Sequence, residues 1–227
     1  FMIKYVREIT PTLENITTLM YSNIDEDRIA LREQVEKALR RLSHEMLIQK
    51  NGNKYIFLTN EEQEIENAIR GQNVENSEIT RHVAEQFFEE IYGEKKYFFP
   101  MFNNRYSFGF NQKVDDRAYK NQNFDMTLHL LTPMSDESHN DTALRLLSGQ
   151  SSCVLVVLPQ NTDFWDETRI AMQIEQYFHM DTGSGAIKYE QIKAAKRQEM
   201  NEHRRNAKLC LEDNLRSAVI YINGNIV

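Results

Sequence analysis

The feature that most constrains this chain is a clean apolar stripe with helical spacing near its N-terminus. The stripe consists of Leu31, Val35, Ala38, Leu39 and Leu42, which recur at the positions of one helix face. Acidic residues at 25–27 precede the stripe, and Arg40 and Arg41 lie near its end. Because the helix dipole favours anions at the start and cations at the end, the pattern predicts a stable amphipathic helix over about 28–42.

A β-hairpin is predicted directly after this helix. Two apolar runs, 46–48 and 55–58, flank Asn51-Gly52, and this dipeptide between apolar runs is a strong hairpin signal. Residues 11–21 also have helical spacing. Helix, helix and hairpin is the order of a winged helix, with the 28–42 helix in the recognition position and the hairpin as the wing. The alternative is a generic helix–hairpin element inside a larger fold.

The rest of the chain indicates helices around a mixed sheet. A capping-box pattern at Thr59–Glu62 predicts the start of a short acidic helix. Further helices are expected at 77–93, 163–180 and 186–216, strands at 97–99, 106–110, 124–131 and 153–158, and a polar loop at 112–123. We therefore expect an α+β chain with a winged-helix domain over 1–71, a helical linker over 72–93 and a mixed-sheet α/β domain over 94–227.

The helix expected at 186–216 has an almost wholly polar middle, from Lys193 to Lys208. A helix that is polar all round is usually a spacer or an arm whose partner lies elsewhere. The sequence thus predicts a long helical arm.

Composition places the chain among ordinary intracellular proteins. The net charge is −7, no apolar run approaches the roughly 18 residues of a membrane span, and the N-terminus lacks the order of a signal peptide. The two cysteines, Cys153 and Cys210, lie far apart in apolar patterns and indicate no disulfide framework. We expect a cytoplasmic protein without membrane contact.

Both ends of the chain indicate a piece of a longer protein. Phe1 precedes Met2, which is an unusual start for a natural polypeptide. At the other end, residues 218–222 read as a strand and Asn223-Gly224 as a type I′ turn, yet only two apolar residues of a returning strand follow. We expect the parent protein to continue.

No motif for nucleotide hydrolysis is present in the sequence. A P-loop needs G-x-x-x-x-G-K-[ST], and the nearest approach, residues 183–188, has the wrong spacing and no preceding strand. The strand expected at 153–158 ends in Pro159-Gln160 rather than in an acidic magnesium ligand. We expect no catalytic residue, cofactor or metal in this chain.

One acidic stretch is kept as a conditional site. Asp115, Asp116 and Arg117 would act as a catalytic group only if a deep pocket gathered them with His129. The alternative is a solvated turn with an internal ion pair, and His129 is then a satisfied sheet residue. The six histidines are scattered, which argues against a metal site.

The predicted recognition helix and wing carry the candidate contacts to nucleic acid or to a partner protein. Their cations are typical of phosphate contacts. They are Arg28, Arg32, Lys37, Arg40, Arg41, Lys50 and Lys54. The acidic residues 25–27 weigh against sequence-specific reading, because they would face phosphates where the helix begins.

Several stretches resemble one family in a consistent order. Residues 55–65 (YIFLTNEEQEI), 108–117 (FGFNQKVDDR) and 164–167 (FWDE), and the charged 186–216 helix leading to 219–224, resemble segments of the large P-loop ATPase of bacterial BREX phage-exclusion systems (BrxC/PglY type). The resemblance implies a role in defence against phage. It also implies an ATP- and magnesium-binding module elsewhere in the parent protein, and partners that include a methyltransferase and a phosphatase-like protein.

The expected function is therefore that of a non-catalytic central region of a BREX-type ATPase, which mediates protein–protein contacts and contacts with DNA. One alternative is a winged-helix DNA-binding transcription regulator whose C-terminal part senses a ligand or dimerises. The other is an enzyme whose site is assembled by residues 105–132.

Overall fold

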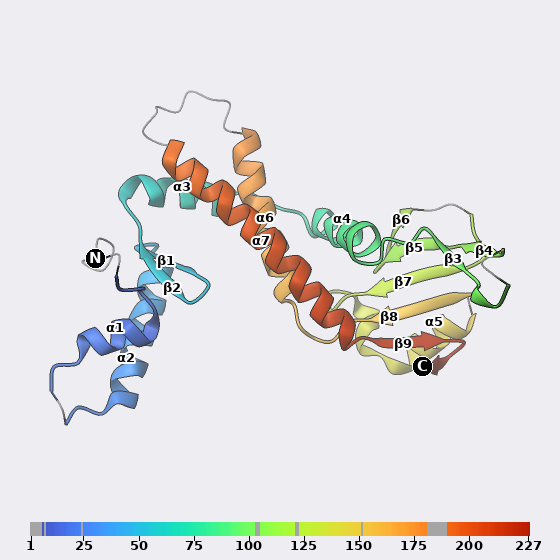
Figure 1. Cartoon of the computed structure of the whole chain (residues 1–227), viewed down its shortest axis with the longest axis horizontal. Coiled ribbons are helices and arrows are strands. Elements are labelled where there is room, and N and C mark those ends of the chain that lie inside the picture. The colour runs from blue at the N-terminus through green and yellow to red at the C-terminus, as the bar shows by residue number, and fades with distance from the viewer. Residues whose placement is uncertain are drawn as a thin grey trace. The chain divides into compact units, whose positions relative to one another are not determined.

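The structure is a computed structural model that describes residues 6, 8–23, 25–102, 105–120, 123–150, 152–180 and 190–227. It divides into two compact units, Phe1–Gly71 and Gln72–Val227. Figure 1 labels the elements of both units along the chain. Each unit has its own hydrophobic core, and each is described by itself.

The first unit contains the predicted helix, helix and hairpin in that order. Its elements are α1 (Leu13–Met20), α2 (Arg28–His44), β1 (Ile48–Asn51), β2 (Lys54–Phe57) and α3 (Asn60–Arg70). Leu31, Val35 and Leu39 of α2 are buried with Ile48, whereas Ala38 of the predicted stripe is exposed. The apolar stripe is therefore narrower than expected, and it packs on the hairpin and on α1.

Local signals fix the boundaries of these elements. Asp27 caps α2, since its Oδ1 accepts hydrogen bonds from the backbone N–H of Ile29 at 2.9 Å and of Ala30 at 3.3 Å. The Thr59–Glu62 capping box at the start of α3 is present in full. In the hairpin, Asn51 pairs with Lys54, so Gly52 is the first residue of a two-residue turn and adopts a φ of +58°. A positive φ at this position is the reason that glycine suits this turn.

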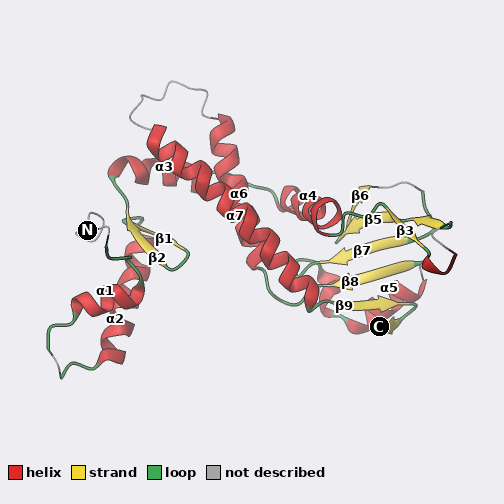
Figure 2. Cartoon of the chain, in the orientation of Figure 1, coloured by secondary structure: helices red, strands yellow, loops and turns green. Residues whose placement is uncertain are grey.

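The second unit is built on a six-stranded mixed sheet with the order β10-β9-β8-β7-β5-β6. Strands β5, β7 and β8 are parallel, and β6, β9 and β10 extend the sheet with antiparallel pairings. The strands are β5 (Asn111–Val114), β6 (Arg117–Lys120), β7 (Thr127–Leu131), β8 (Cys153–Val157), β9 (Val219–Ile222) and β10 (Asn225–Ile226). A separate ribbon pairs β3 (Lys96–Phe98) with β4 (Ser107–Gly109), both labelled in Figure 1. Figure 2 shows the strands of this unit in yellow.

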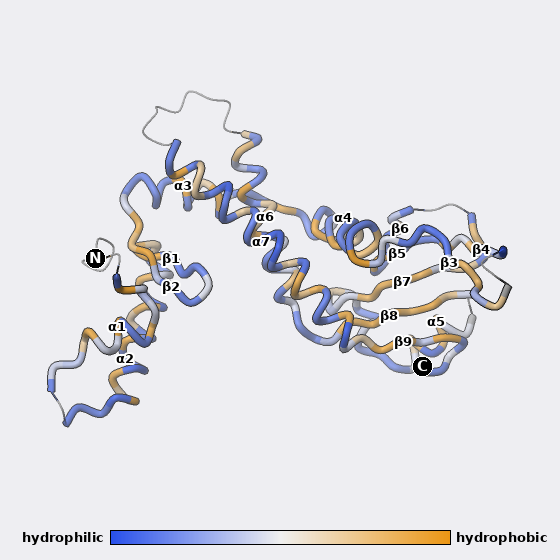
Figure 3. The backbone as a smooth tube through the Cα atoms, viewed as in Figure 1, coloured by the Kyte–Doolittle hydropathy of each residue, from blue (hydrophilic) through white to orange (hydrophobic). Residues whose placement is uncertain are grey.

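Helices cover both faces of this sheet. They are α4 (Asn76–Glu85), the π-helical η2 (Gln86–Ile91), α5 (Asp141–Gln150), α6 (Asp163–Met180) and α7 (Glu190–Arg216), with short 3-10 turns η3 (Pro100–Phe102) and η4 (Asp136–His139). Leu130 of β7 joins the core beneath α4, η2, α6 and α7, whereas its neighbour Leu131 joins the core beneath α5. Successive strand residues point to opposite faces, so one apolar strand serves both cores. Figure 3 shows the resulting hydrophobic colour along β7 and β8.

Three expectations for this region need correction. Residues 112–123 were expected to form a polar loop, but β5 and β6 form a hairpin there. Val114 supplies the missed signal, because it is buried while Lys113 is not, as in a strand with one face on the core. Residues 72–93, expected to be a helical linker, contribute Ile79, Val83 and Phe88 to the main core of the second unit.

The third correction concerns the long helical arm. Residues 190–216 form α7, and 186–189 lie outside the described residues. The partner of α7 is not elsewhere, because α7 packs along α6 of the same unit. Leu211 and Ala207 are fully buried in this packing, and the polar middle of the helix is satisfied by ion pairs to α6 and η2. Ion pairs therefore hold α7 against its neighbours together with the buried apolar side chains.

The C-terminal hairpin follows the sequence signal closely. Ile222 pairs with Asn225, and the intervening Asn223 and Gly224 both adopt positive φ values of 50° and 76°. Two positive φ values are the signature of the expected type I′ turn. Among the described residues, no helix combines the length and apolar character needed to cross a membrane.

Candidate functional site

The candidate contacts of the first unit lie on two elements, α2 and the β1–β2 hairpin. Arg28, Arg32, Lys37, Arg40 and Arg41 are all exposed on α2. Lys50 and Lys54 are exposed on β1 and β2, on either side of the turn. The predicted residues are therefore accessible on these two elements.

Three of the seven cations are held by acids of the same unit. Arg40 donates to Glu36 at 2.7 Å and Arg41 to Glu45 at 2.9 Å, each one helical turn away. Arg32 lies 3.9 Å from Glu14 of α1. The hydrogen bond and charge of Arg40 lower the pKa of Glu36 below its usual value. These pairs reduce the positive potential of α2, because each cation has a neighbouring anion.

The other four cations form no ion pair with a described acid. Lys50 places its Nζ 6.0 Å from the centre of the Tyr55 ring. Arg28, Lys37 and Lys54 complete the set. They are the residues of this unit best able to meet a phosphate or a carboxylate from outside, because no internal pair must be broken first.

The conditional site of the second unit lies at the turn between β5 and β6. Asp115 is 8% exposed and adopts a φ of +50°. Its Oδ1 accepts the backbone N–H of Thr132 at 2.7 Å, and its Oδ2 accepts the Thr132 hydroxyl at 2.9 Å. Burial raises the pKa of Asp115, an effect that these two hydrogen bonds oppose. The carboxylate thus joins the end of β5 to the end of β7.

His129 supports the same turn from below. Its Nε2 lies 2.6 Å from the backbone oxygen of Asp115, so the Nε2–H tautomer donates to that carbonyl. Burial, followed by the charge of Lys113, lowers the pKa of His129 from 6.5 to about 4. The histidine is therefore neutral near pH 7 and acts as a hydrogen-bond donor of the sheet, which agrees with a satisfied sheet residue.

The neighbouring pair behaves differently. Asp116 is 88% exposed and its Oδ1 lies 4.0 Å from Nε of Arg117. This is the expected solvated turn with an internal ion pair. The acidic pair is thus split, with Asp115 fixed in the fold and Asp116 in solvent.

An open cavity of about 510 Å³ adjoins this turn at the carboxyl ends of the parallel strands. Asp115, Asp116 and Arg117 line it together with Lys113, Ser77 and Trp165, but His129 does not. Trp165 is 2% exposed and its Nε1–H has no hydrogen-bond partner among the described residues. The carboxyl edge is where open α/β sheets bind ligands. The conditional hypothesis requires a deep pocket that gathers all four residues, whereas this open cavity is lined by Asp115, Asp116 and Arg117 without His129.

Sequence reasoning missed two members of this arrangement. Thr132 follows the strand at 127–131 directly, and a hydroxyl after a buried parallel strand was a usable signal. Trp165 is the sole tryptophan of the chain and occupies the first turn of α6. Neither has a sequence motif that ties it to Asp115, because the contacts arise from strand order rather than from spacing.

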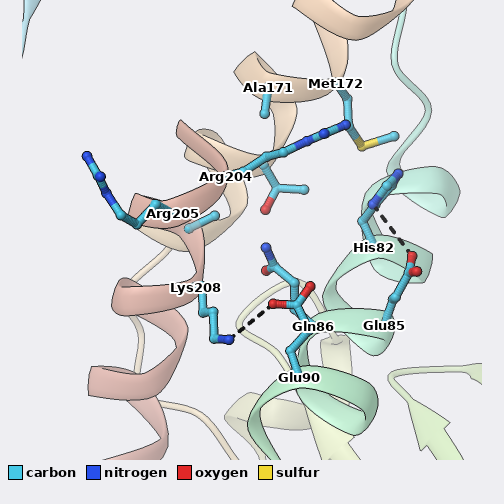
Figure 4. A pocket seen from close by; sticks show the side chains of 11 residues that line it. His82, Glu85, Gln86, Glu90, Ala171, Met172, Arg204, Arg205 and Lys208 are labelled. Carbon is cyan, nitrogen blue, oxygen red and sulfur yellow. Dashed lines mark ion pairs between the residues drawn. The ribbon is translucent and has the colours of Figure 1, made fainter. Parts of the chain in front are cut away.

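A second cavity, of about 450 Å³, lies between α4, η2, α6 and α7 (Figure 4). Lys208 bridges it to Glu90 at 3.2 Å, and Arg204 extends across α6 to pair with Glu175 at 2.7 Å. The Oε1 atom of Gln86 is buried here without a hydrogen-bond partner among the described residues. Figure 4 shows Arg205 pointing away from the cavity. Arg204 and Lys208 are therefore both engaged in ion pairs that hold α7 against its neighbours.

The residues that line the two cavities bear on nucleotide and metal binding. No glycine lines either of them. Among the described residues, no group of three His, Cys, Asp or Glu could hold a metal ion. The strand–loop–helix unit from β8 to α6 passes through Pro159 and Asn161 instead of a glycine-rich turn. Asn161 is engaged twice, since its backbone oxygen accepts from Asn214 at 3.0 Å and its Oδ1 accepts from the N–H of Asp163 at 2.8 Å. The β8–α6 connection therefore lacks the glycine-rich pattern of a P-loop.

Comparison with known proteins places the chain. No solved structure matches it. Residues 72–227, which are the whole second unit, match a family model described as the BREX ATP-binding protein BrxC 4th domain with six-stranded beta sheet. The sheet of this unit has six strands in the order given above. The chain belongs to the BrxC family of BREX phage-defence proteins, with the fourth domain of that family at residues 72–227.

Proposed function

We propose that this chain is a non-catalytic region of a BREX-type ATPase that mediates contacts with partner proteins and DNA. In this proposal ATP and magnesium bind to another module of the parent protein. The methyltransferase and phosphatase-like components of such systems are its expected partners. The chain itself positions these components while ATP is hydrolysed elsewhere.

The connection between β8 and α6 carries this proposal. In a P-loop protein, the corresponding strand–loop–helix unit leaves glycine backbone N–H groups free to cradle phosphates. Here the loop contains Pro159, and Asn161 is tied to α6 and to α7 by its two hydrogen bonds. A loop closed in this way offers no phosphate cradle. The sheet therefore supports a packed scaffold better than a catalytic one.

The helical pair α6–α7 supports a positioning role. His203 bonds Glu167 at 2.7 Å and Arg204 bonds Glu175 at 2.7 Å, so two adjacent residues of α7 form ion pairs with two separate positions of α6. Phe178 adds a cation–π contact, with the Arg197 guanidinium 4.9 Å from its ring centre. A rigid pair of this length can transmit a displacement, because its elements move as one packed body.

For the first unit we propose a winged helix. The order α1, α2 and β-hairpin supports it, as does the extra strand-like pairing of Thr12 with Lys54 and the 2.8 Å bond from the Tyr55 N–H to the Pro11 oxygen. In this arrangement α2 holds the recognition position and the hairpin is the wing. The four cations without ion pairs would contact DNA or a partner protein. They are Arg28, Lys37, Lys50 and Lys54.

Phage plating with the complete system tests this function. The parent protein is changed at Arg28, Lys37, Lys50 and Lys54 to glutamine, and the control changes the internally paired Arg40 and Arg41 to glutamine. We expect the fourfold variant to lose protection against phage by at least about 10-fold while its ATPase rate stays within about twofold, because only contact charges are removed. The control should retain protection.

Full protection by the fourfold variant would contradict the proposed contact role of the first unit. A duplex-binding assay with the chain alone separates the alternative. Tight, sequence-selective binding that is lost in Arg32→Ala or Lys37→Ala would favour a winged-helix transcription regulator.

A further inference from the structure

The ribbon of β3 and β4 presents an aromatic face that no part of the proposed function uses. Tyr97 and Phe108 are cross-strand partners. The ladder continues past the strands, because the Phe99 N–H donates to the Tyr106 oxygen at 2.9 Å. Residues two apart in a strand share a face, so these four rings form two successive aromatic pairs on one side of the ribbon. We call this set the aromatic ribbon face.

Three of the four rings of the aromatic ribbon face are exposed, and Phe99 is half-buried. Tyr97 is 46% exposed, Phe108 is 50% exposed and Tyr106 is 58% exposed. On the opposite side of the ribbon, Phe98 is 48% exposed. Contiguous exposed apolar area of this kind marks an interaction site in soluble proteins, because leaving it in water is unfavourable.

The base of the ribbon is anchored to the unit, so the rings are held on a fixed platform. Gly109 lies against the Phe124 ring so closely that a Cβ atom there would meet ring carbons at 2.2 Å and 2.3 Å. Tyr92 packs edge-on against Phe110 at 5.7 Å between ring centres. A preorganised aromatic platform binds with less loss of side-chain freedom than a flexible one.

Basic residues accompany the rings. Lys95, Lys96 and Arg105 are exposed at the two ends of the strands, against a single acid, Glu94, in the same stretch. Neither Lys96 nor Arg105 forms an ion pair with a described acid. This local excess of positive charge occurs in a chain whose net charge is −7. The positive charge therefore belongs to the ribbon rather than to the chain as a whole.

We infer that the β3–β4 ribbon binds single-stranded nucleic acid, with bases stacked on Tyr97, Phe99, Tyr106 and Phe108 and with the backbone phosphates near Lys96 and Arg105. Single strands are bound by this combination of aromatic platforms and cations, and each stacked base contributes about 1–3 kcal/mol. A docked protein fits less well, because lysine is depleted in the cores of protein interfaces. Neighbouring rings along one strand are about 7 Å apart, which leaves room for a separate base on each.

Fluorescence anisotropy with labelled oligothymidine and oligouridine of about 20 nucleotides tests this site on the whole 227-residue chain. A duplex of the same length is the third probe. We expect binding of one or both single strands at about 50 mM salt and much weaker binding at about 200 mM. The comparison of the two single strands shows whether DNA or RNA is preferred.

Two sets of variants report on the two parts of the site. Tyr97→Leu with Phe108→Leu should weaken single-strand binding at least about 10-fold, the scale of one lost stack. Tyr97→Phe with Phe108→Tyr keeps the rings and should bind within about twofold. Lys96→Gln with Arg105→Gln should reduce the dependence of log K on log salt by about 1.4, since each phosphate contact on a single strand contributes about 0.7.

The matched control is Arg216→Gln, which removes an exposed cation at the end of α7 that pairs with Asp213 at 2.6 Å. This variant should bind single strands as the wild type does. The ring substitutions leave α2 and the β1–β2 hairpin unchanged, so a failure of the winged-helix proposal leaves this test unaffected. The inference is overturned if no single strand binds at about 50 mM salt. It is overturned equally if the leucine variant, folded by circular dichroism, binds as tightly as the wild type, which would leave protein docking as the use of the ribbon.

Discussion

At the scale of residues, one carboxylate connects the turn between β5 and β6 to the end of β7. Both oxygens of Asp115 accept hydrogen bonds from Thr132, one from its backbone and one from its hydroxyl. Asparagine keeps the shape but can accept at only one of these two positions. We expect Asp115→Asn to lower the free energy of unfolding by about 1–3 kcal/mol, because a buried donor loses its partner.

Asp116→Asn is the matched control for this substitution, because Asp116 differs from Asp115 in exposure and not in type. Its effect should stay within about 0.5 kcal/mol, as for other surface substitutions. Urea denaturation of both variants measures the difference. Equal effects of the two substitutions would show that the Asp115–Thr132 bonds do not hold the turn.

Two histidines, the buried His129 and the half-buried His203, predict opposite dependences on pH. The pKa of His129 falls to about 4 in the folded chain, so the unfolded chain binds more protons below its pKa of about 6.5. Stability therefore decreases as the pH falls from about 6.5 towards 4, by an amount on the order of 3 kcal/mol in full. Glutamine at position 129 keeps a donor for the Asp115 carbonyl and does not titrate. In thermal melts, the His129→Gln variant should therefore lose less stability than the wild type as the pH falls.

His203 gives the reverse sign. Burial opposes its charge, but the carboxylates of Glu199 at 3.7 Å and Glu167 at 2.7 Å outweigh burial and raise the pKa of His203. The contribution of His203 to the free energy of unfolding is fully present below about pH 6.5. It disappears as the pH rises through the pKa of His203 in the folded chain. His203→Gln should therefore lower the melting temperature more at pH 6 than at pH 9. A loss that is larger at pH 9 would contradict the assigned ion pairs.

At the scale of elements, Gly109 limits how β4 meets the rest of the unit. An added Cβ atom would overlap the Phe124 ring, so Gly109→Ala should destabilise the chain by about 1–3 kcal/mol. Gly149 of α5 is the control, because its nearest neighbours would lie at 3.9 Å and 4.0 Å and alanine is the better helix former. Thermal melts should show a lower midpoint for Gly109→Ala and an unchanged or higher one for Gly149→Ala.

The elements differ in how far the sequence predicts them. The 28–42 stripe, the Asn51-Gly52 hairpin and the Asn223-Gly224 turn are local patterns, and each is present in the structure. The β5–β6 hairpin was missed because its residues are mostly polar and only Val114 marks the buried face. The sequence predicts a distant partner for the 186–216 helix because its middle has no apolar period. In the structure, polar residues of α7 contact α6 through ion pairs instead.

The candidate site was harder to predict than the fold. Asp115, Asp116 and Arg117 adjoin in sequence and line one open cavity, but the conditional hypothesis requires a deep pocket that also contains His129. Three further residues lie near the Asp115 turn. His129 belongs to β7, Thr132 follows that strand directly, and Trp165 belongs to α6. Their approach follows from the parallel order of β5, β7 and β8, which no spacing in the sequence encodes.

At the scale of the whole molecule, we propose that ATP is hydrolysed by another part of the parent protein and that this chain makes contacts with partners. The described residues place cations and aromatic rings on exposed elements, and they fill the β8–α6 loop with side-chain and backbone bonds instead of a phosphate cradle. We therefore expect this chain to keep its fold when it is separated from the module that hydrolyses ATP.

ATP hydrolysis by the purified 227-residue chain tests this claim most directly. With magnesium and saturating ATP, the account predicts a phosphate-release rate equal to that of a preparation carrying Asp115→Asn and Arg117→Gln, and equal to buffer. Hydrolysis by the wild-type chain that disappears in this double variant would contradict the account, because it would place a working catalytic site at the carboxyl edge of the sheet.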